Sequence, residues 1–204
     1  ANRAHPQAAL ATFYTALAYE RMGRFDTATQ TYVRIANDFN STRDAAGHEL
    51  TGDDLTQRVN ILEQSNFRAA VNLERIFDYD SSIRYYGNVV IDQRFANAQD
   101  HASHVHDSMA SIALINLNLA RWEAARTAWQ NFIPRAAAGR ERSEAEFRVA
   151  EIPFRAGNWT DAIRSLQDYL RRTAPSADNA QFRVLAQYNI ALANRSLNNA
   201  TAYR

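Results

Sequence analysis

The histidine-rich stretch from Asp100 to Asp107 is the one place in the chain where possible metal ligands cluster. On a helix, His101 and Asp100 lie three and four residues before His104, so these three side chains share a face, whereas His106 points elsewhere. A catalytic zinc ion needs three protein ligands gathered in a pocket, and an open helix surface seldom provides them. We therefore interpret the stretch as the polar start of a helix and predict no metal site.

Two pairs of arginines have a spacing that suits recognition of carboxylates. In each pair the arginines are seven residues apart, which is two turns along one helix face, and a phenylalanine precedes the first: Phe67, Arg68 and Arg75, and Phe147, Arg148 and Arg155. Guanidinium groups placed in this way can hold an acidic peptide or a terminal carboxylate through bidentate contacts. The pattern indicates a binding surface for a polypeptide.

Structural ion pairing is the alternative interpretation of the same arginines. In this interpretation Glu20, Glu74, Glu151 and their neighbours pair with these arginines between repeats. Surface pairs of that kind contribute about 0–1 kcal/mol each and carry little functional meaning. Both interpretations remain open at this stage.

The sequence shows no recognisable catalytic motif. No serine, histidine and acid fall in a nucleophile arrangement, the acidic residues form no paired-carboxylate signature, and the glycines are too isolated to cradle a phosphate. All 23 basic residues are arginine and the chain has no cysteine, which excludes lysine and thiol chemistry. We predict a non-catalytic protein with no catalytic residue and no cofactor.

The charge of the chain argues against two classes of partner. A formal net charge of +1 over 204 residues creates no general attraction for nucleic acid or anionic membranes. A helical-repeat protein that reads RNA would need basic and planar side chains at the same place in successive units, and Ser111 and Asn118 break that series. No apolar run approaches the roughly 18 residues of a membrane span. We predict no nucleic-acid binding and no direct membrane insertion.

The elements that must position these side chains are all helical. Apolar residues make up 46% of the chain, and only 6 glycines and 4 prolines interrupt the helical periodicity. One pattern recurs: a helix end, an opening aromatic residue, a small residue three places on and a large residue four further. Its copies are Phe25, Ala28 and Tyr32; Tyr79, Ser82 and Tyr86; Trp122, Ala125 and Trp129; Trp159, Ala162 and Leu166; and a truncated copy from Leu197 to Ala202.

This alternation resembles the tetratricopeptide repeat (TPR), a pair of antiparallel helices of about 34 residues. Successive opening aromatics are 54, 43 and 37 residues apart, so helices must be lengthened or loops inserted. The resemblance implies an all-α, right-handed α-solenoid over residues 1–204, a single segment of about four and a half helix pairs. We expect the chain to be a fragment of a longer array.

The helices are expected over residues 6–22, 25–39, 54–77, 79–95, 98–119, 122–133, 141–156, 159–173 and 179–197. Residues 43–53 carry two glycines and little periodicity, and are predicted to form an insertion loop that ends in Asp53 as the N-cap of the next helix. Pro153 lies inside a helical pattern, where it removes one backbone hydrogen bond, so we expect a kink there.

In TPR proteins the first helix of each pair lines a concave groove, and the resemblance implies the same here. The expected peptide-binding groove then comprises Phe13, Tyr14, Arg21, Phe67, Arg68, Arg75, Asn118, Phe147, Arg148 and Arg155. The implied function is a protein–protein interaction scaffold that holds a protein or peptide partner with an acidic segment. The alternative is a regulatory repeat arm of a larger enzyme or receptor whose catalytic domain lies elsewhere.

A second resemblance concerns the compartment. The stretches from Asn116 to Trp122 and from Arg172 to Ala177 are similar to TPR proteins of the bacterial cell envelope, which scaffold assemblies between the membranes. That similarity favours the envelope or periplasm over the cytoplasm only weakly, so the localisation is left unknown.

Overall fold

The computed structural model describes residues 7–44 and 47–202, and its regular structure there consists of nine α-helices and one short 3-10 helix. The only strand-like pairing in this described part is an isolated bridge between Arg43 and Glu49. The chain divides into two compact units, one ending at Ser111 and the other beginning at Ile112, and each is described separately. The all-α, TPR-like helical-repeat fold predicted from the sequence is confirmed.

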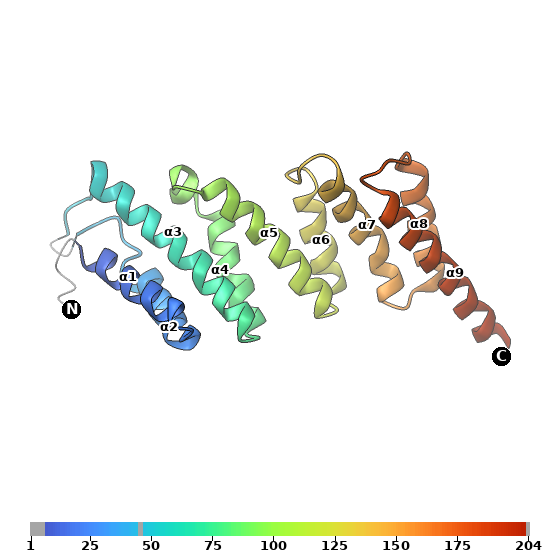
Figure 1. The fold of residues 1–204 in the computed structure, drawn as a ribbon, viewed down its shortest axis with the longest axis horizontal. Coiled ribbons are helices and arrows are strands. Elements are labelled where there is room, and N and C mark those ends of the chain that lie inside the picture. The colour runs from blue at the N-terminus through green and yellow to red at the C-terminus, as the bar shows by residue number, and fades with distance from the viewer. Residues whose placement is uncertain (1–6, 45–46, 203–204) are drawn as a thin grey trace. The chain divides into compact units, whose positions relative to one another are not determined.

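The first unit consists of two helix pairs and the start of a third. It contains α1 (Ala8–Arg21), α2 (Phe25–Asp38), α3 (Gly52–Arg75), α4 (Tyr79–Ile91), η1 (Gln93–Asn97) and most of α5 (His101–Asn118) (Figure 1). α1 packs on α2, α2 on α3 and α3 on α4, while α1 also touches α3. The first helices of the pairs, α1 and α3, therefore lie side by side in one layer. The second helices, α2 and α4, belong to the other layer.

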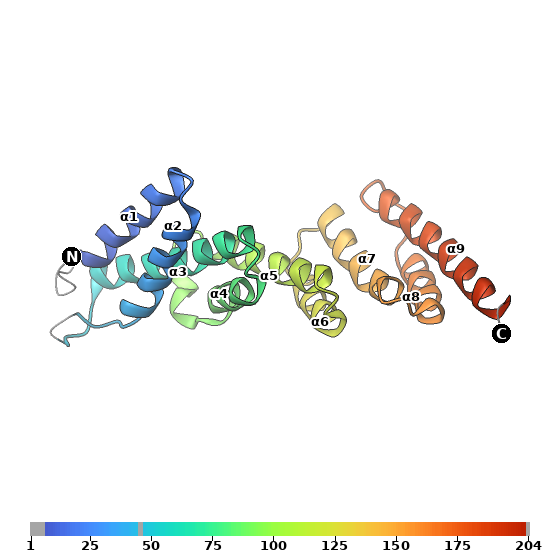
Figure 2. The same cartoon turned by 90° about the horizontal axis from the view of Figure 1, so that it is seen from below.

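The second unit repeats this arrangement. It contains the end of α5, then α6 (Trp122–Phe132), α7 (Arg140–Arg155), α8 (Trp159–Arg172) and α9 (Ala180–Ala202) (Figure 2). α6 packs on α7, α7 on α8 and α8 on α9, and α7 also touches α9. α9 thus has the same neighbours, relative to α7 and α8, that α3 has relative to α1 and α2.

The alternating small and large residues seal each pair. Ala28, Ser82, Ala125 and Ala162, one from each second helix, are completely buried. The large residues that follow them four positions later are Tyr32, Tyr86, Trp129 and Leu166, and these are buried as well. Small side chains let the two helices of a pair approach, and the large side chains fill the space one turn along. The pattern predicted from the sequence is confirmed.

The turns between first and second helices share one backbone conformation. Gly23, Phe77, Ala120 and Gly157 all have positive φ, between 55° and 75°. In every case the next residue donates its N–H to a carbonyl five residues earlier, the hydrogen bond of a Schellman motif, at 2.9 Å. Glycine adopts this left-handed conformation freely, whereas an L-residue such as Phe77 is strained by about 1–2 kcal/mol.

Several predicted element boundaries are wrong. α3 begins at Gly52 after an extended Thr51, so Asp53 lies in the first turn and is not the N-cap; there its carboxylate still faces the positive end of the helix. α4 ends at Ile91 and not near Phe95, because the Asp92 side chain accepts a hydrogen bond from the Arg94 N–H and starts η1.

The prediction of a truncated fifth copy of the repeat pattern is also wrong. Residues 197–202 continue α9 and do not begin a new helix, since no glycine or proline interrupts the stretch. The loop predicted at 43–53 is irregular up to Thr51, with residues 45–46 outside the described part. Pro153 lies within α7, which runs on to Arg155.

Candidate functional site

A groove lies between α1 and α3, the first helices of the first two pairs. Its volume is about 500 Å³, and it is lined by Leu10, Phe13, Tyr14, Leu17, Asp53, Thr56, Gln57, Asn60, Ile61 and Gln64. The residues from α1 are apolar or aromatic, whereas α3 contributes mainly amide and hydroxyl groups. One wall can therefore contact apolar side chains, and the other can hydrogen-bond to a polypeptide backbone.

Two aromatic residues shape the apolar wall. The ring of Phe13 is buried and lies 5.9 Å from the ring of Tyr32 on α2, measured between centroids, which fixes it in the core. Tyr14 is 61% exposed, and its ring meets that of Phe13 edge to face at 6.1 Å. Tyr14 therefore lies at the rim of the groove, packed against the buried Phe13 ring. A partner chain can cover its exposed face there.

The polar wall has little net charge. Gln57, Asn60 and Gln64 are spaced three and four residues apart, on one face of α3. The Asn60 Oδ1 atom accepts a hydrogen bond from the backbone N–H of Gln99 at 2.9 Å, which holds that side chain in place. Among the described residues that line the groove, Asp53 is the only charged one and none is an arginine.

The predicted groove residues of the first unit have different surroundings. Phe13 and Tyr14 line the groove, and Arg21 is exposed at the end of α1. Phe67 is half-buried, stacked on the His104 ring at 4.2 Å. The Arg68 guanidinium forms an ion pair with Glu20 at 3.1 Å, and that of Arg75 lies 5.0 Å above the Phe25 ring.

The predicted groove residues of the second unit are dispersed. Asn118 and Arg155 are exposed at the ends of α5 and α7. Phe147 is only 1% exposed and packs between Tyr169 and Phe182, so its ring serves the core of α7, α8 and α9. Arg148 bonds to Glu144 at 2.9 Å and to Glu151 at 3.2 Å, both on its own helix. The two arginine pairs do not form a matched set of free guanidinium groups.

Two of the three glutamates considered as partners of those arginines do form ion pairs with them. Glu20 accepts hydrogen bonds from the Tyr32 hydroxyl at 2.8 Å and from Arg68, so it does link α1, α2 and α3. Glu74 accepts a bond from the Tyr86 hydroxyl at 3.0 Å. Burial, reinforced by the Glu20 carboxylate, raises the pKa of Tyr32 well above its usual value. Structural pairing between helices thus applies to Glu20. Glu151 pairs with Arg148 within α7, and Glu74 bonds to Tyr86 within the α3–α4 pair.

The histidine-rich stretch contacts a carboxylate that the sequence did not single out. Glu63 of α3 is completely buried, and its oxygens lie 2.9 Å from Nδ1 of His104 and 3.4 Å from Nδ1 of His101. Among the described residues, no group of three or more histidine, cysteine or acidic side chains is arranged to hold a metal ion. A glutamate inside the apolar seam of a long helix was the sequence signal for such a contact.

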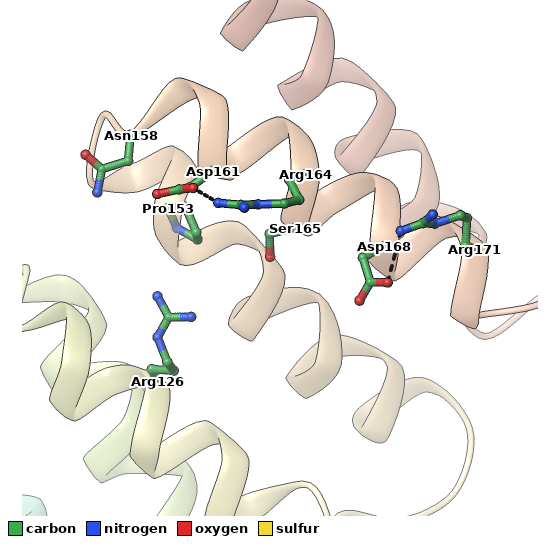
Figure 3. A pocket seen from close by; sticks show the side chains of 8 residues that line it. All are labelled: Arg126, Pro153, Asn158, Asp161, Arg164, Ser165, Asp168 and Arg171. Carbon is green, nitrogen blue, oxygen red and sulfur yellow. Dashed lines mark hydrogen bonds and ion pairs between the residues drawn. The ribbon is translucent and has the colours of Figure 1, made fainter.

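A second cavity, which the sequence did not suggest, lies in the second unit beside the second helices α6 and α8. It measures about 510 Å³ and is lined by Arg126 of α6, Pro153 of α7, and Asn158, Asp161, Arg164, Ser165, Asp168 and Arg171 at the start and along one face of α8 (Figure 3). Asp161 pairs with Arg164, and Asp168 pairs with Arg171 at 3.3 Å. Arg126 lies across from them, with Glu123 at 3.6 Å.

A smaller polar pocket, of about 250 Å³, lies between α2 and α4. Arg94 crosses it, donating to the carbonyl and Oδ1 oxygens of Asn40 at 2.7 Å each and to both oxygens of Asp92. Hydrogen bonds from Arg94 lower the pKa of Asp92 below its usual range. The arginine is thus occupied by the protein itself and fastens the end of α4 to the end of α2.

The comparisons with known proteins identify one repeat directly. A family model described as "Tetratricopeptide repeat" matches residues 10–39, which cover nearly all of α1, the turn at Gly23 and α2. No curated protein matches the chain. Among the described residues, no helix is both long and apolar enough to cross a membrane.

Proposed function

Because the chain is a tetratricopeptide repeat protein, we propose that it is a non-catalytic scaffold that binds a partner polypeptide in the groove between α1 and α3. TPR repeats generally mediate protein–protein interactions, which is the class of function assigned here. The observation that carries the proposal is the lining of the groove: an apolar wall from α1 opposite an amide-bearing wall from α3. The repeat arm of a larger enzyme has no comparable observation in its favour.

The size of the groove fits a short stretch of chain. Ligand pockets in proteins commonly measure about 300–1,000 Å³, and the groove falls within that range. It can hold one or two large side chains of the partner beside Tyr14, while Gln57 and Gln64 hydrogen-bond to the partner's backbone. Glutamine presents both a donor and an acceptor, which matches a peptide unit.

The chemistry of the lining favours a neutral or basic segment. Asp53 stands in the groove, whereas Arg21 and Arg75 are not among the residues that line it. Like charges placed together without compensation weaken an interface. An acidic segment, which the arginine spacing suggested, remains a separate prediction, and it would have to engage surfaces outside this groove.

Selection from a display library of random peptides of about 12 residues tests the proposal. Peptides that bind the full chain should lose about tenfold in affinity, or about 1.4 kcal/mol, on Tyr14→Ala, and a similar amount on the double change of Gln57 and Gln64 to Ala. The matched control is Tyr188→Ala, which removes an equally exposed tyrosine from α9. If the selected peptides bind the groove variants as tightly as the unchanged chain, the groove is not the binding site.

A further inference from the structure

The turns that follow α1 and α3 expose apolar side chains. Met22 is 62% exposed, Ile76 42% and Phe77 75%, and we refer to these three residues as the tip patch. Both turns lie at the same edge of the first unit (Figure 1). Arg75, at the end of α3, reaches the Phe25 ring at the start of α2, which ties the two turns together.

Phe77 is exposed at a turn position whose backbone conformation favours glycine. It occupies the left-handed position that glycine holds at Gly23 and Gly157, where its φ of 65° is unfavourable for an L-residue. Its ring lies mostly in solvent, with one edge contact to Tyr79 at a centroid distance of 6.1 Å. A large apolar ring that is exposed at a strained position suits a contact with a partner.

Three exposed arginines belong to the turns that carry the tip patch or to the helix ends beside them. Arg21, Arg24 and Arg75 are exposed, and the guanidinium carbons of Arg24 and Arg75 lie over the rings of Tyr19 and Phe25, at 4.8 and 5.0 Å from the ring centroids. Within residues 7–44 and 47–202, none of the three guanidinium groups forms an ion pair with a carboxylate. Arg75 donates one hydrogen bond, from Nη1 to the Asn72 Oδ1 atom at 3.4 Å. Stacking leaves the other guanidinium edges available, and carboxylates are the groups that fit them best.

The acidic residues near the turns favour a protein over a membrane as the partner. Asp26, Asp78 and Asp80 are exposed at the starts of α2 and α4, so each turn carries acidic as well as basic groups close in the sequence. An anionic lipid surface would repel these carboxylates as it attracted the arginines. A polypeptide can place its own charges to match such a mosaic.

We propose that the tip patch is a second docking surface, separate from the groove, and that it takes a polypeptide segment in which an apolar side chain is flanked by carboxylates. The apolar side chain contacts Met22, Ile76 and Phe77, and the carboxylates bond to the surrounding arginines. This arrangement, an apolar centre with arginine at its border, is characteristic of the energetically dominant part of protein interfaces.

Three synthetic peptides of about 12 residues test the proposal. All carry a central tryptophan and leucine, which are flanked by glutamate, by lysine or by glutamine. We expect the glutamate peptide to bind the full chain about tenfold more tightly than the lysine peptide in a fluorescence anisotropy titration. Phe77→Gly should weaken this binding about tenfold, and changing Arg21 and Arg24 together to Gln should remove the preference for acid.

Controls separate this surface from the groove and from lipid. Tyr14→Ala, a groove variant, should leave binding of the glutamate peptide unchanged, and so should Tyr188→Ala. The proposal is overturned if none of the peptides binds at millimolar concentration, if all three bind equally, or if the glutamate peptide binds the Phe77→Gly variant normally. Co-sedimentation with phosphatidylglycerol vesicles that depends on Phe77 would assign the patch to membranes and would also overturn it.

Discussion

Single residues at the turns show where the chain departs from the most stable choice. Gly23 and Gly157 fit the left-handed turn between paired helices, whereas Phe77 and Ala120 occupy the same position with strain. Local stability does not explain the phenylalanine, because glycine would serve the turn better. Substitutions at these equivalent positions therefore allow the backbone strain to be measured.

Phe77→Gly should raise the free energy of unfolding by about 1 kcal/mol, because it relieves the strained backbone and removes an exposed ring. Gly157→Ala should lower it by about the same amount, since alanine must adopt a φ of 75° there. Urea denaturation of both variants measures the two changes. A loss of stability on Phe77→Gly would mean that the ring supports the fold.

Residue types also decide how much of the candidate site was predictable. Tyr14 was predicted for the groove because its position on the first helix follows from the repeat pattern. Glu63 and its contacts with His101 and His104 were not predicted, because they join positions about 40 residues apart. Periodicity assigns a residue to a face, but only the packing of α3 against α5 brings these particular side chains together.

At the scale of elements, most helices were predicted and several of their ends were not. The small and large residues at Ala28 and Tyr32 or at Ala162 and Leu166 have the helical spacing that fixes a pair. The ends depend on local hydrogen bonds, as at Asp92, where a side chain captures the backbone of Arg94 and stops α4. Such a bond competes with one more helical turn, and composition alone does not decide which prevails.

The end of α4 should respond to pH through Asp92. Because hydrogen bonds from Arg94 lower the pKa of Asp92 in the folded chain, the carboxylate stabilises the fold above pH 4, and this contribution is lost as the pH falls through the lowered pKa. Asp92→Asn should therefore lower stability by about 1 kcal/mol at pH 7, a modest figure because Arg94 is partly exposed.

Chemical denaturation of the chain and of the Asp92→Asn variant at a series of pH values checks this expectation. The difference in unfolding free energy should shrink as the medium becomes acidic. A difference that stays constant down to pH 2 would show that the variant loses a structural contact unrelated to the charge of Asp92.

For the whole molecule, contacts between neighbouring helices dominate within each unit. α1 to α4 form one series of packed neighbours and α6 to α9 another, as expected for helical repeats. Stability in such a protein is spread along the chain, so a defect in one pair need not open the others. The spacing of the repeat motif predicted this organisation, whereas the division near residue 111 had no signal in the sequence.

Leu166→Ala removes a completely buried side chain from α8 and should destabilise its surroundings by about 3 kcal/mol. Amide hydrogen exchange should then speed up in α7, α8 and α9 and stay unchanged in α1 and α2. Ile35→Ala, equally buried in α2, is the reciprocal control. Faster exchange in every helix of both variants would show instead that the chain unfolds as a single cooperative body.

The interaction of a peptide with the first helices is the claim on which the assigned function depends. A nuclear magnetic resonance titration of the full chain with a library-selected peptide tests it most directly, because every backbone amide reports separately. We predict that the largest shifts fall on Leu10, Tyr14, Gln57 and Gln64, the residues that face one another across the groove. Shifts confined to the second helices α2 and α4, with these four residues unmoved, would contradict the account.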